Sequence, residues 1–483
     1  MKMNQTINMA PRFRVLSEDQ IEQIYFAALD VLETCGGRII HEEALDRFRK
    51  SEAVITDKNL VRIPTSLVER ALRSYPRKIT LMGRNGQRSV KLQKDEVAFG
   101  TGSDTPFVYD RKTGERRRST FDDVAAAARI VDYLPNFDFF MSHGLVSDVP
   151  NPKTYDRHQF LAMIMNNTKP MVVTSVDGEG LKDQWEMACL IRGNEEEFRL
   201  NPLFVVYIEP ISPLTHSKEA VEKLVFAAEK GIPAMYTPCL SAGGTAPATI
   251  AGMLVQSVAE VLMAAVLCYL IKPGMPLIMG GVQTVMDMRT SIYSYGAPEL
   301  SLASAASTDI SKWLGLLMFS TGGCSDSKVV DEQAAVESAM SLYNAFLSGA
   351  NFVHDVGYLD SGLNGSLPSL VMCDEIIGMI RQIGKGIRVD DETLSLDVLN
   401  EVGPGGEFVS HDHTFNHWKE WYRPTFIDRS NYETWVTTGK KTFNDRIEEQ
   451  VDHILETYET EPLDENVLKE MKKIIDLADK RHS

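Results

Sequence analysis

The side chains best able to do chemistry stand where short apolar runs stop. Two such runs, Leu314–Ser320 and Asn351–Val353, flank a segment of helical apolar period that ends near Leu347. A strand, a helix and a strand in that order predict a βαβ unit, and ligands of parallel sheets gather at the carboxyl ends of the strands. The polar residues that follow the two runs are Cys324, Asp326, His354, Asp355 and Tyr358.

Earlier strand ends add aromatic and acidic side chains to the same rim. The combined set is richer in aromatic rings and carboxylates than in bases, which suits the binding of a cation. We take Asp326 and His354 as candidate catalytic residues. The candidate substrate-binding residues are Tyr207, Glu209, Tyr236, Gln283, Asp355 and Tyr358.

Three histidines near the C-terminus could be metal ligands, but their spacing does not support a metal site. His413 and His417 would share one face of a helix, but no carboxylate or cysteine completes a ligand set there. We favour structural hydrogen bonds for these two and for His411 over an active-site role, and we expect no bound metal.

Nucleophile and phosphate motifs are also weak. Residues 323–326 do not form the G-x-S-x-G elbow of serine hydrolases, and a small residue in a tight turn explains Cys324 better than a nucleophile does. Residues 100–104 are rich in glycine, but the Lys-Ser/Thr pair of a phosphate loop does not follow them.

The strands and helices that would position these side chains recur with the spacing of a (β/α)₈ barrel. From about residue 137, a strand and then a helix repeat roughly every thirty residues. The last strand is the least distinct, and we place it at Glu407–Ser410. The other expected strands are Phe137–Met141, Met171–Thr174, Leu203–Ile208, Ala234–Tyr236, Leu277–Met279 and the two runs described above.

The chain outside the barrel divides into two additions. Residues 1–125 combine an amphipathic helix capped by Ser17 with short strands and turns, which predicts a mixed α/β lobe. We expect the barrel to span residues 126–410. Residues 411–483 then form a helical extension packed on the barrel, which could also serve as a dimer element.

Composition limits the partners. The formal net charge of −17 among 483 residues argues against nucleic-acid binding, and the run Arg116–Arg118 fits a solvated turn better than a docking patch. Six cysteines without a CxxC pair suit a reducing compartment. The N-terminus lacks the apolar core of a signal peptide, and the run Val261–Ile271 is too short to span a bilayer. We expect a cytoplasmic homo-oligomer that does not enter the membrane.

Several separate stretches carry a resemblance that runs over nearly the whole chain. They are Thr321–Lys328 with Asp331–Ala335, Gly349–Leu363, Asp374–Met379, Val402–Gly406, Asp412–Thr414 and Asp428–Trp435. Together they resemble the trimethylamine methyltransferase family of corrinoid-dependent enzymes.

The resemblance implies a TIM barrel that moves a methyl group from an amine to the Co(I) centre of a separate corrinoid protein. Trimethylamine-specific members of the family use pyrrolysine, which this sequence lacks, and the corresponding position would fall near residues 321–326. The chain therefore resembles the non-pyrrolysine branch. Glycine betaine is the expected donor in that branch, and proline betaine, carnitine and γ-butyrobetaine are alternatives.

We expect the corrinoid to remain with the partner protein. Asp156-Arg157-His158 is the only D-x-H segment, and Leu161 stands where a D-x-H-x-x-G cobalamin motif needs glycine. Cobalamin is then supplied by the partner and is not a permanent cofactor of this chain. A betaine-binding barrel without activity, or a metal-dependent hydrolase or lyase built on the histidines, would be the competing functions.

Transfer from a quaternary ammonium asks for positioning more than for acid or base catalysis, because the amine leaves without protonation. Aromatic faces and carboxylates can hold the cation, and a betaine carboxylate needs a hydrogen-bond donor. We predict that His354 faces inward and is that donor. Asp355, next to it on the strand, would then point to the opposite side.

Overall fold

Eight parallel strand segments close into a barrel in the computed structural model, which describes residues 11–482. Seven of them form one sheet in the order β6-β18-β17-β14-β12-β10-β9, and single bridges from residues 139 and 140 to β6 and β9 close the ring. The strands are β6 (Ala98–Thr101), β9 (Met171–Val173), β10 (Phe204–Ile208), β12 (Ala234–Tyr236), β14 (Leu277–Gly280), β17 (Leu317–Thr321) and β18 (Phe352–Val356).

The predicted barrel is confirmed, but its first and last strands are formed by other residues than expected. β6 pairs in parallel with β18 and is the first strand, although this segment was expected in the N-terminal lobe. Residues 407–410, the expected eighth strand, form no strand and are exposed. The expected strand at 137–141 is reduced to two bridged residues. The barrel sheet therefore starts before residue 126 and is complete by β18.

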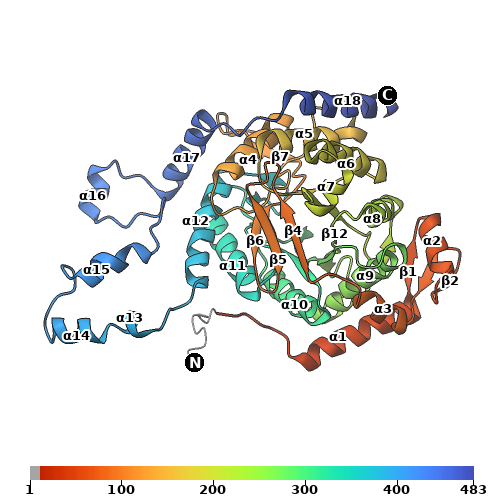
Figure 1. The fold of residues 1–483 in the computed structure, drawn as a ribbon, viewed down its shortest axis with the longest axis horizontal. Coiled ribbons are helices and arrows are strands. Elements are labelled where there is room, and N and C mark those ends of the chain that lie inside the picture. Colours follow the sequence, from red (N-terminus) through yellow and green to blue (C-terminus); the bar gives the residue numbers. More distant parts are fainter. Residues whose placement is uncertain (1–10, 483) are drawn as a thin grey trace.

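Helices surround the strands as a ring, seen along its axis in Figure 1. The most apolar of them, α9, is long enough to cross a membrane, but 72% of its most apolar window is buried within this chain, as in a core helix. The ring consists of α4 (Phe121–Tyr133), α5 (Tyr155–Asn166), α6 (Gly178–Arg192), α8 (Lys218–Lys230), α9 (Ile250–Ile271), α10 (Pro298–Leu314), α11 (Glu332–Ser348) and α12 (Leu367–Gly384).

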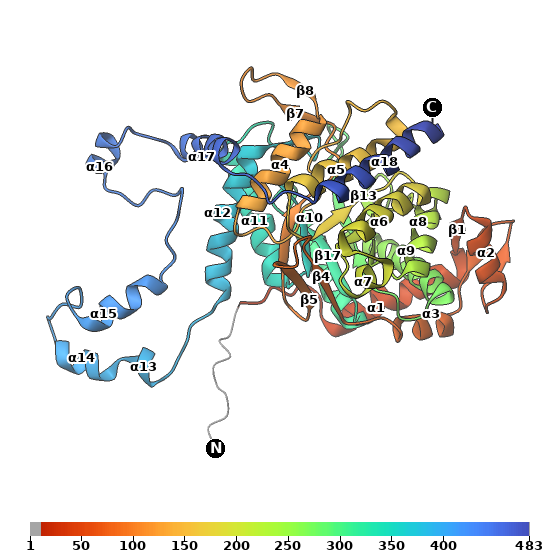
Figure 2. The same ribbon diagram turned by 45° about the horizontal axis from the view of Figure 1, so that its top comes forward.

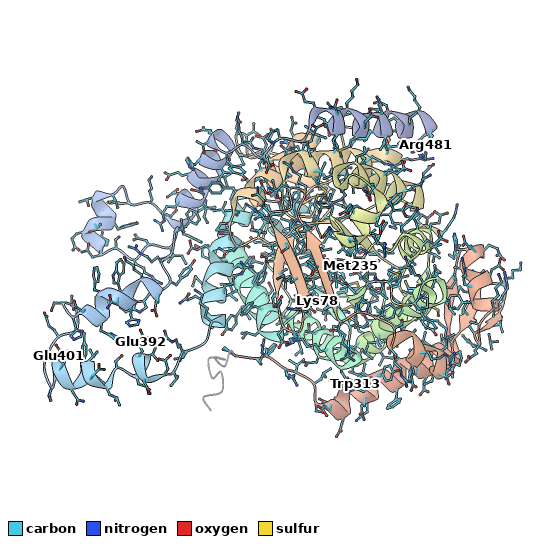
Figure 3. The ribbon with its side chains drawn as sticks, in the orientation of Figure 1. Lys78, Met235, Trp313, Glu392, Glu401 and Arg481 are labelled. Carbon is cyan, nitrogen blue, oxygen red and sulfur yellow. The ribbon has the colours of Figure 1, made fainter. Side chains whose placement is uncertain are left out.

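A β-hairpin closes one end of the barrel. The strands β4 (Lys78–Met82) and β5 (Ser89–Gln93) bury Ile79, Leu81 and two further apolar residues against the side chains that fill the barrel interior. Met235 belongs to that interior layer and lies within the helical ring in Figure 3. Because the interior is packed and this end is covered, a ligand site must lie at the other end, where the strands finish.

The first part of the N-terminal region, residues 18–72, packs beside α9. Its helices are α1 (Glu18–Asp30), α2 (Glu42–Arg49) and α3 (Thr65–Leu72), and each contacts α9. Ser17 caps α1 through a capping box, as predicted. A small sheet of β1 (Gly37–Ile39), β2 (Val54–Thr56), β3 (Leu60–Arg62) and β11 (Thr215–His216) joins this lobe to the loop after β10.

Of the segment that follows α12, only the last two helices pack extensively on the barrel. α17 (Phe443–Thr457) lies against α12 and α4, and α18 (Glu465–His482) lies against α6 and α5. In contrast, residues 385–442, which we call the arm, extend away from the barrel in both views (Figures 1 and 2). The expected packing of residues 411–442 is wrong except near Tyr422 to Phe426, which bond to Glu375 of α12.

The arm contains four short α-helices and the histidines His411, His413 and His417. Glu392 and Glu401 mark its distance from the barrel in Figure 3. Its helices are α13 (Asp391–Leu394), α14 (Leu396–Val402), α15 (Asp412–His417) and α16 (Tyr432–Thr437).

The D-x-H segment forms part of a buried ion-pair network. Arg157 is fully buried, and its guanidinium donates to Asp156 at 2.8 Å and to Asp183 at 3.0 Å. His158 contacts Asp479 of α18 at 3.1 Å. These contacts bind α5, α6 and the C-terminal helix together, so the segment has a structural role.

Replacing Arg157 with methionine should destabilise the fold strongly. The substitution would leave Asp156 buried without its cation, and breaking a buried pair in this way costs about 3–5 kcal/mol. Chemical denaturation of the variant measures the change. Arg73→Met is the matched control, because Arg73 is 78% exposed beside Glu69 and should change stability by less than about 1 kcal/mol. Equal stability of the two variants would contradict the structural role.

Candidate active site

A cavity of about 390 Å³ opens among the residues that follow the barrel strands. Its wall combines several tyrosine rings with carboxyl groups and one lysine, Lys223. Such a surface is suited to binding a cation. The aromatic and acidic lining residues include Tyr155, Tyr207, Tyr295, Tyr358, Asp104, Glu209 and Asp355.

Five of the eight predicted site residues line this cavity. Tyr207, Glu209, His354, Asp355 and Tyr358 meet there from β10 and β18 and the loops that follow them. The structure thus brings together the aromatic and acidic groups that the strand ends indicated.

Tyr236 and Gln283, predicted to bind substrate, do not line the cavity. Met235 pairs with Tyr207 and points into the barrel, so Tyr236 points outward, where its hydroxyl meets His216 Nδ1 at 2.5 Å. Gln283 is fully buried, with Nε2 donating to Ser257 at 2.7 Å.

Asp326 lies behind the cavity wall and holds a loop in place. Its carboxylate accepts from the backbone N–H of Tyr295 at 2.8 Å, from Ser361 at 2.8 Å and from Ser294. Tyr295 in turn presents its ring to the cavity, with its centroid 6.4 Å from that of Tyr358 and the two ring planes nearly perpendicular. The predicted catalytic role of Asp326 is therefore replaced by a positioning role.

His354 and Asp355 both reach the cavity, contrary to the expected alternation. The register of β18 shifts between Val353 and Val356, and Asp355 has a φ of 68°, in the left-handed region. This irregularity turns Asp355 toward the same side as His354. Their side chains approach to 3.3 Å, between His354 Nε2 and Asp355 Oδ2.

The hydrogen bonding of His354 opposes its predicted role as a donor. Nδ1 lies 2.7 Å from the carbonyl of Ser320, which can only accept, so Nδ1 carries the proton. Burial lowers the pKa of His354 to about 3, so the ring is neutral and Nε2 is an acceptor. A neutral ring in this tautomer cannot donate to a substrate carboxylate.

Asp355 is the most strongly perturbed carboxyl group of the cavity. Burial first, and the charge of Glu209 second, raise its pKa well above the ordinary range. Asp355 Oδ1 and the Tyr358 hydroxyl lie so close to Gly102 that a Cβ atom at this position would be within 2.3 Å of both. The glycine-rich run after β6 therefore makes room for the site. The Tyr358 hydroxyl donates to the carbonyl of Ser103 in the same run.

Glu209 is oriented by two neighbours. The Tyr207 hydroxyl donates to Oε1 at 2.5 Å, and the Cys239 thiol donates to the same oxygen at 2.7 Å. Burial raises the pKa of Cys239 well above its ordinary value, so it remains a thiol. These contacts fix the carboxylate between the strand ends of β10 and β12.

Prediction from the ends of the expected strands missed cavity residues that come from other elements. Asp104 follows β6, and burial raises its pKa although Gln159 donates to it at 2.7 Å. Tyr295 comes from a loop held by Asp326, and Lys223 comes from α8. Recognising β6 as a barrel strand would have indicated Asp104, whereas the other two lack a strand-end signal.

The remaining sequence candidates lie outside the cavity. Burial raises the pKa of Cys324 well above its ordinary value, and this thiol does not line the cavity. His413 bonds to Ser395 at 2.8 Å and His417 to Glu420 at 2.9 Å within the arm. Within residues 11–482, no three His, Cys, Asp or Glu side chains are placed to share a metal ion. The run Arg116–Arg118 forms β8, in which two of the arginines are paired with carboxylates.

Comparison with known sequences identifies the family. Residues 1–482 match the family described as trimethylamine methyltransferase (MTTB). The chain belongs to the trimethylamine methyltransferase family. It is 34% identical to the trimethylamine methyltransferase MttB of Desulfitobacterium hafniense, over 95% of this chain and 93% of that protein. It is 33% identical to a glycine betaine methyltransferase of Desulfitobacterium hafniense, over 95% of this chain and 96% of that protein. A methyltransferase activity follows from this membership.

The monomethylamine methyltransferase MtmB of Methanosarcina barkeri has a similar fold. The two structures align with a TM-score of 0.51 over 92% of this chain and 89% of MtmB, at 13% sequence identity. At this identity the similarity supports the barrel fold of the methyltransferase and carries no information about its substrate.

The affinity of the methyltransferase for a small cation should rise with pH. A protonated Asp355 must release its proton to pair with the cation, so affinity should rise about tenfold per pH unit up to the raised pKa and then level off. Calorimetric titration with tetramethylammonium at a series of pH values measures this dependence. In Asp355→Asn the dependence should flatten, and a wild-type affinity independent of pH would contradict the assignment.

Proposed function

We propose that the protein transfers a methyl group from a quaternary amine to the Co(I) centre of a separate corrinoid protein, with glycine betaine as the donor. The observation that carries the proposal is the cavity itself. Tyrosine rings and buried carboxyl groups surround a space at the barrel mouth, and its only histidine is neutral. Relatives named as trimethylamine and glycine betaine methyltransferases support methylated amines as the substrate class.

The reaction needs no proton transfer. The electron pair of Co(I) forms the bond to the methyl carbon, the carbon–nitrogen bond breaks, and its electron pair stays on nitrogen. The products are a neutral tertiary amine and methyl-Co(III). The protein must therefore hold the methyl group in line with cobalt and exclude competing nucleophiles. Tyr295 and Tyr358 supply perpendicular ring faces for the ammonium group.

The buried groups around the D-x-H segment support a corrinoid supplied by the partner. A corrinoid ligand loop would need His158 free, whereas His158 contacts Asp479 and its neighbour Arg157 is locked in buried ion pairs. Cobalt therefore enters as a substrate carried by another protein that docks over the barrel mouth. Both proteins would then operate in the cytoplasm.

Methyl transfer can be followed by the absorbance change from Co(I) to methyl-Co(III) cobalamin. The purified protein should show no corrinoid absorbance of its own, should demethylate glycine betaine when Co(I) cobalamin is added, and should be much less active with trimethylamine. In Tyr358→Leu, the loss of the ring should raise the KM for the donor at least about fivefold. Ligand binding without any methyl transfer would instead favour a betaine-binding protein.

We also propose that the arm binds a second copy of this chain. Among residues 385–442, all described by the structure, Phe426 alone is buried. Helices of four to seven residues are unstable in water without packing. The most exposed large apolar side chains of the arm are Ile387, Val389, Leu396, Val409, Phe415, Trp421 and Tyr432, with exposed fractions of 65–85%.

The same chain carries an apolar face suited to cover the arm. Val336 and Met340 share one face of α11, and Met379 and Ile383 share one face of the adjoining α12, from whose end the arm departs. All four side chains are 39–57% exposed. The arm, residues 385–442, is long enough to supply the roughly 20–30 residues that each partner contributes to an interface of standard size. Two copies could cover both surfaces by exchanging arms.

Disrupting the arm should dissociate the oligomer without unfolding the barrel. In the double variant Leu396→Asp/Val409→Asp, light scattering should give the mass of one chain, 54.0 kDa, whereas the wild type should give a multiple of it. Val54→Asp is the matched control, because Val54 is 56% exposed on the N-terminal lobe. A monomeric wild type would overturn the proposal.

A further inference from the structure

The cavity contains a cation that its carboxylates do not pair. Lys223 projects from the second turn of α8 and is the only lysine or arginine in the cavity wall. Its Nζ donates to the carbonyl of Ser175 at 2.9 Å. Among the described residues, no carboxylate oxygen lies within 4.0 Å of Lys223 Nζ, the limit for an ion pair. The carbonyl of Ser175 is the one acceptor within hydrogen-bonding distance of Nζ in this part of the chain. Two of the three ammonium protons therefore remain available.

The strand order places Lys223 opposite Asp355. β10 is the fourth neighbour of β18 in either direction around the barrel, through β17, β14 and β12 or through β6, residues 139–140 and β9. α8 follows β10 and packs on it, and Lys223 reaches the end of β9 at Ser175. Asp355 lies on β18, with Tyr358 just beyond it. Lys223 thus faces Asp355 and Tyr358 across the cavity, whereas Tyr207 and Glu209 at the end of β10 lie on the same side as Lys223.

The side of the cavity that holds Lys223 has further donors. Ser217 caps α8 and lines the cavity together with Ala220, so the amino end of the helix opens onto it. Glu219 lies on the same wall, but this residue is exposed and its charge is screened by water. Four further carboxyl groups act on Lys223 electrostatically, and all lie beyond ion-pair distance. They are the exposed Glu209, the fully buried Asp156, and the partly buried Asp104 and Asp177.

We propose that Lys223 binds the carboxylate of the methyl donor and thereby selects betaines over amines that lack a carboxylate. This inference rests on the proposed function and names the residue that recognises the substrate carboxylate. A zwitterion would place its ammonium group near Asp355, Tyr295 and Tyr358 and its carboxylate at Lys223. A cation without a carboxylate would leave the lysine charge unpaired and repelling it. Lys223 takes the role that sequence periodicity gave to His354, whose available nitrogen is an acceptor.

The test compares two ligands that share a trimethylammonium head, glycine betaine and choline, by calorimetric titration of the full-length protein. Lys223→Met keeps the length of the side chain and removes its charge. Its affinity for glycine betaine should fall at least about tenfold, as expected when a hydrogen bond between charged groups is lost. Its affinity for choline should stay unchanged or rise, because a repulsive charge has been removed.

Two control variants separate the role of the charge from general damage. Lys218→Met removes an exposed lysine of the same helix that pairs with Glu222 at 3.5 Å, and it should leave both affinities unchanged. Lys223→Arg should retain most of the preference for glycine betaine. If Lys223→Met misfolds by circular dichroism, the preference in Lys223→Gln decides the proposal.

The outcomes distinguish this proposal from the proposed function. Equal losses for both ligands in Lys223→Met, or a wild type that binds choline as tightly as glycine betaine, would overturn the role of Lys223. Failure of the wild type to methylate Co(I) cobalamin from any quaternary amine would overturn the function. In that case, a charge-dependent preference for glycine betaine in the binding data would still support the carboxylate site.

Discussion

The burial of carboxyl groups at one end of the barrel is the interaction on which the rest of the site depends. Asp355, Asp104 and Glu209 are brought together because parallel strands all finish at the same edge. Removing negative charges from water without a counter-charge is unfavourable, and the raised pKa of Asp355 is the direct consequence. Without a ligand, the proton that Asp355 retains offsets the cost of burying it. A bound ammonium group would replace that proton as the counter-charge.

A cation bound with limited strength also suits the proposed chemistry. The positive charge on nitrogen disappears as the methyl group leaves, so attraction that stabilises only the substrate would slow the reaction. Tyrosine rings and a carboxyl group that readily takes up a proton hold a cation less firmly than three ionised carboxylates would. The neutral His354, whose ring lies tilted against Phe319 with centroids 4.0 Å apart, adds no positive charge to oppose binding.

Sequence periodicity predicted the barrel and much of the site because strands and helices of such folds repeat regularly. It failed where the backbone departs from that regularity. β6 lies before a long hairpin loop, so its place in the repeat was not apparent, and Asp104 was missed with it. Asp355 was assigned to the wrong side of the strand, because the alternation of side chains along a strand does not predict the register shift in β18. Tyr236 was placed one residue out of phase with the inward-facing Met235. The expected packing of residues 411–442 failed because, apart from the contacts of residues 422–426 with α12, this segment lies away from the surface of its own chain.

Substrate choice within such a family is decided by a few groups rather than by overall similarity. The relatives named for trimethylamine and for glycine betaine resemble this chain almost equally, so identity alone does not separate the two donors. The donors differ in one carboxylate, and a barrel that binds it must present a cation across the mouth from the ammonium site. Lys223 comes from a helix rather than from a strand end, so substitutions there can change the selected donor while the methyl-transfer geometry at the strand ends stays intact.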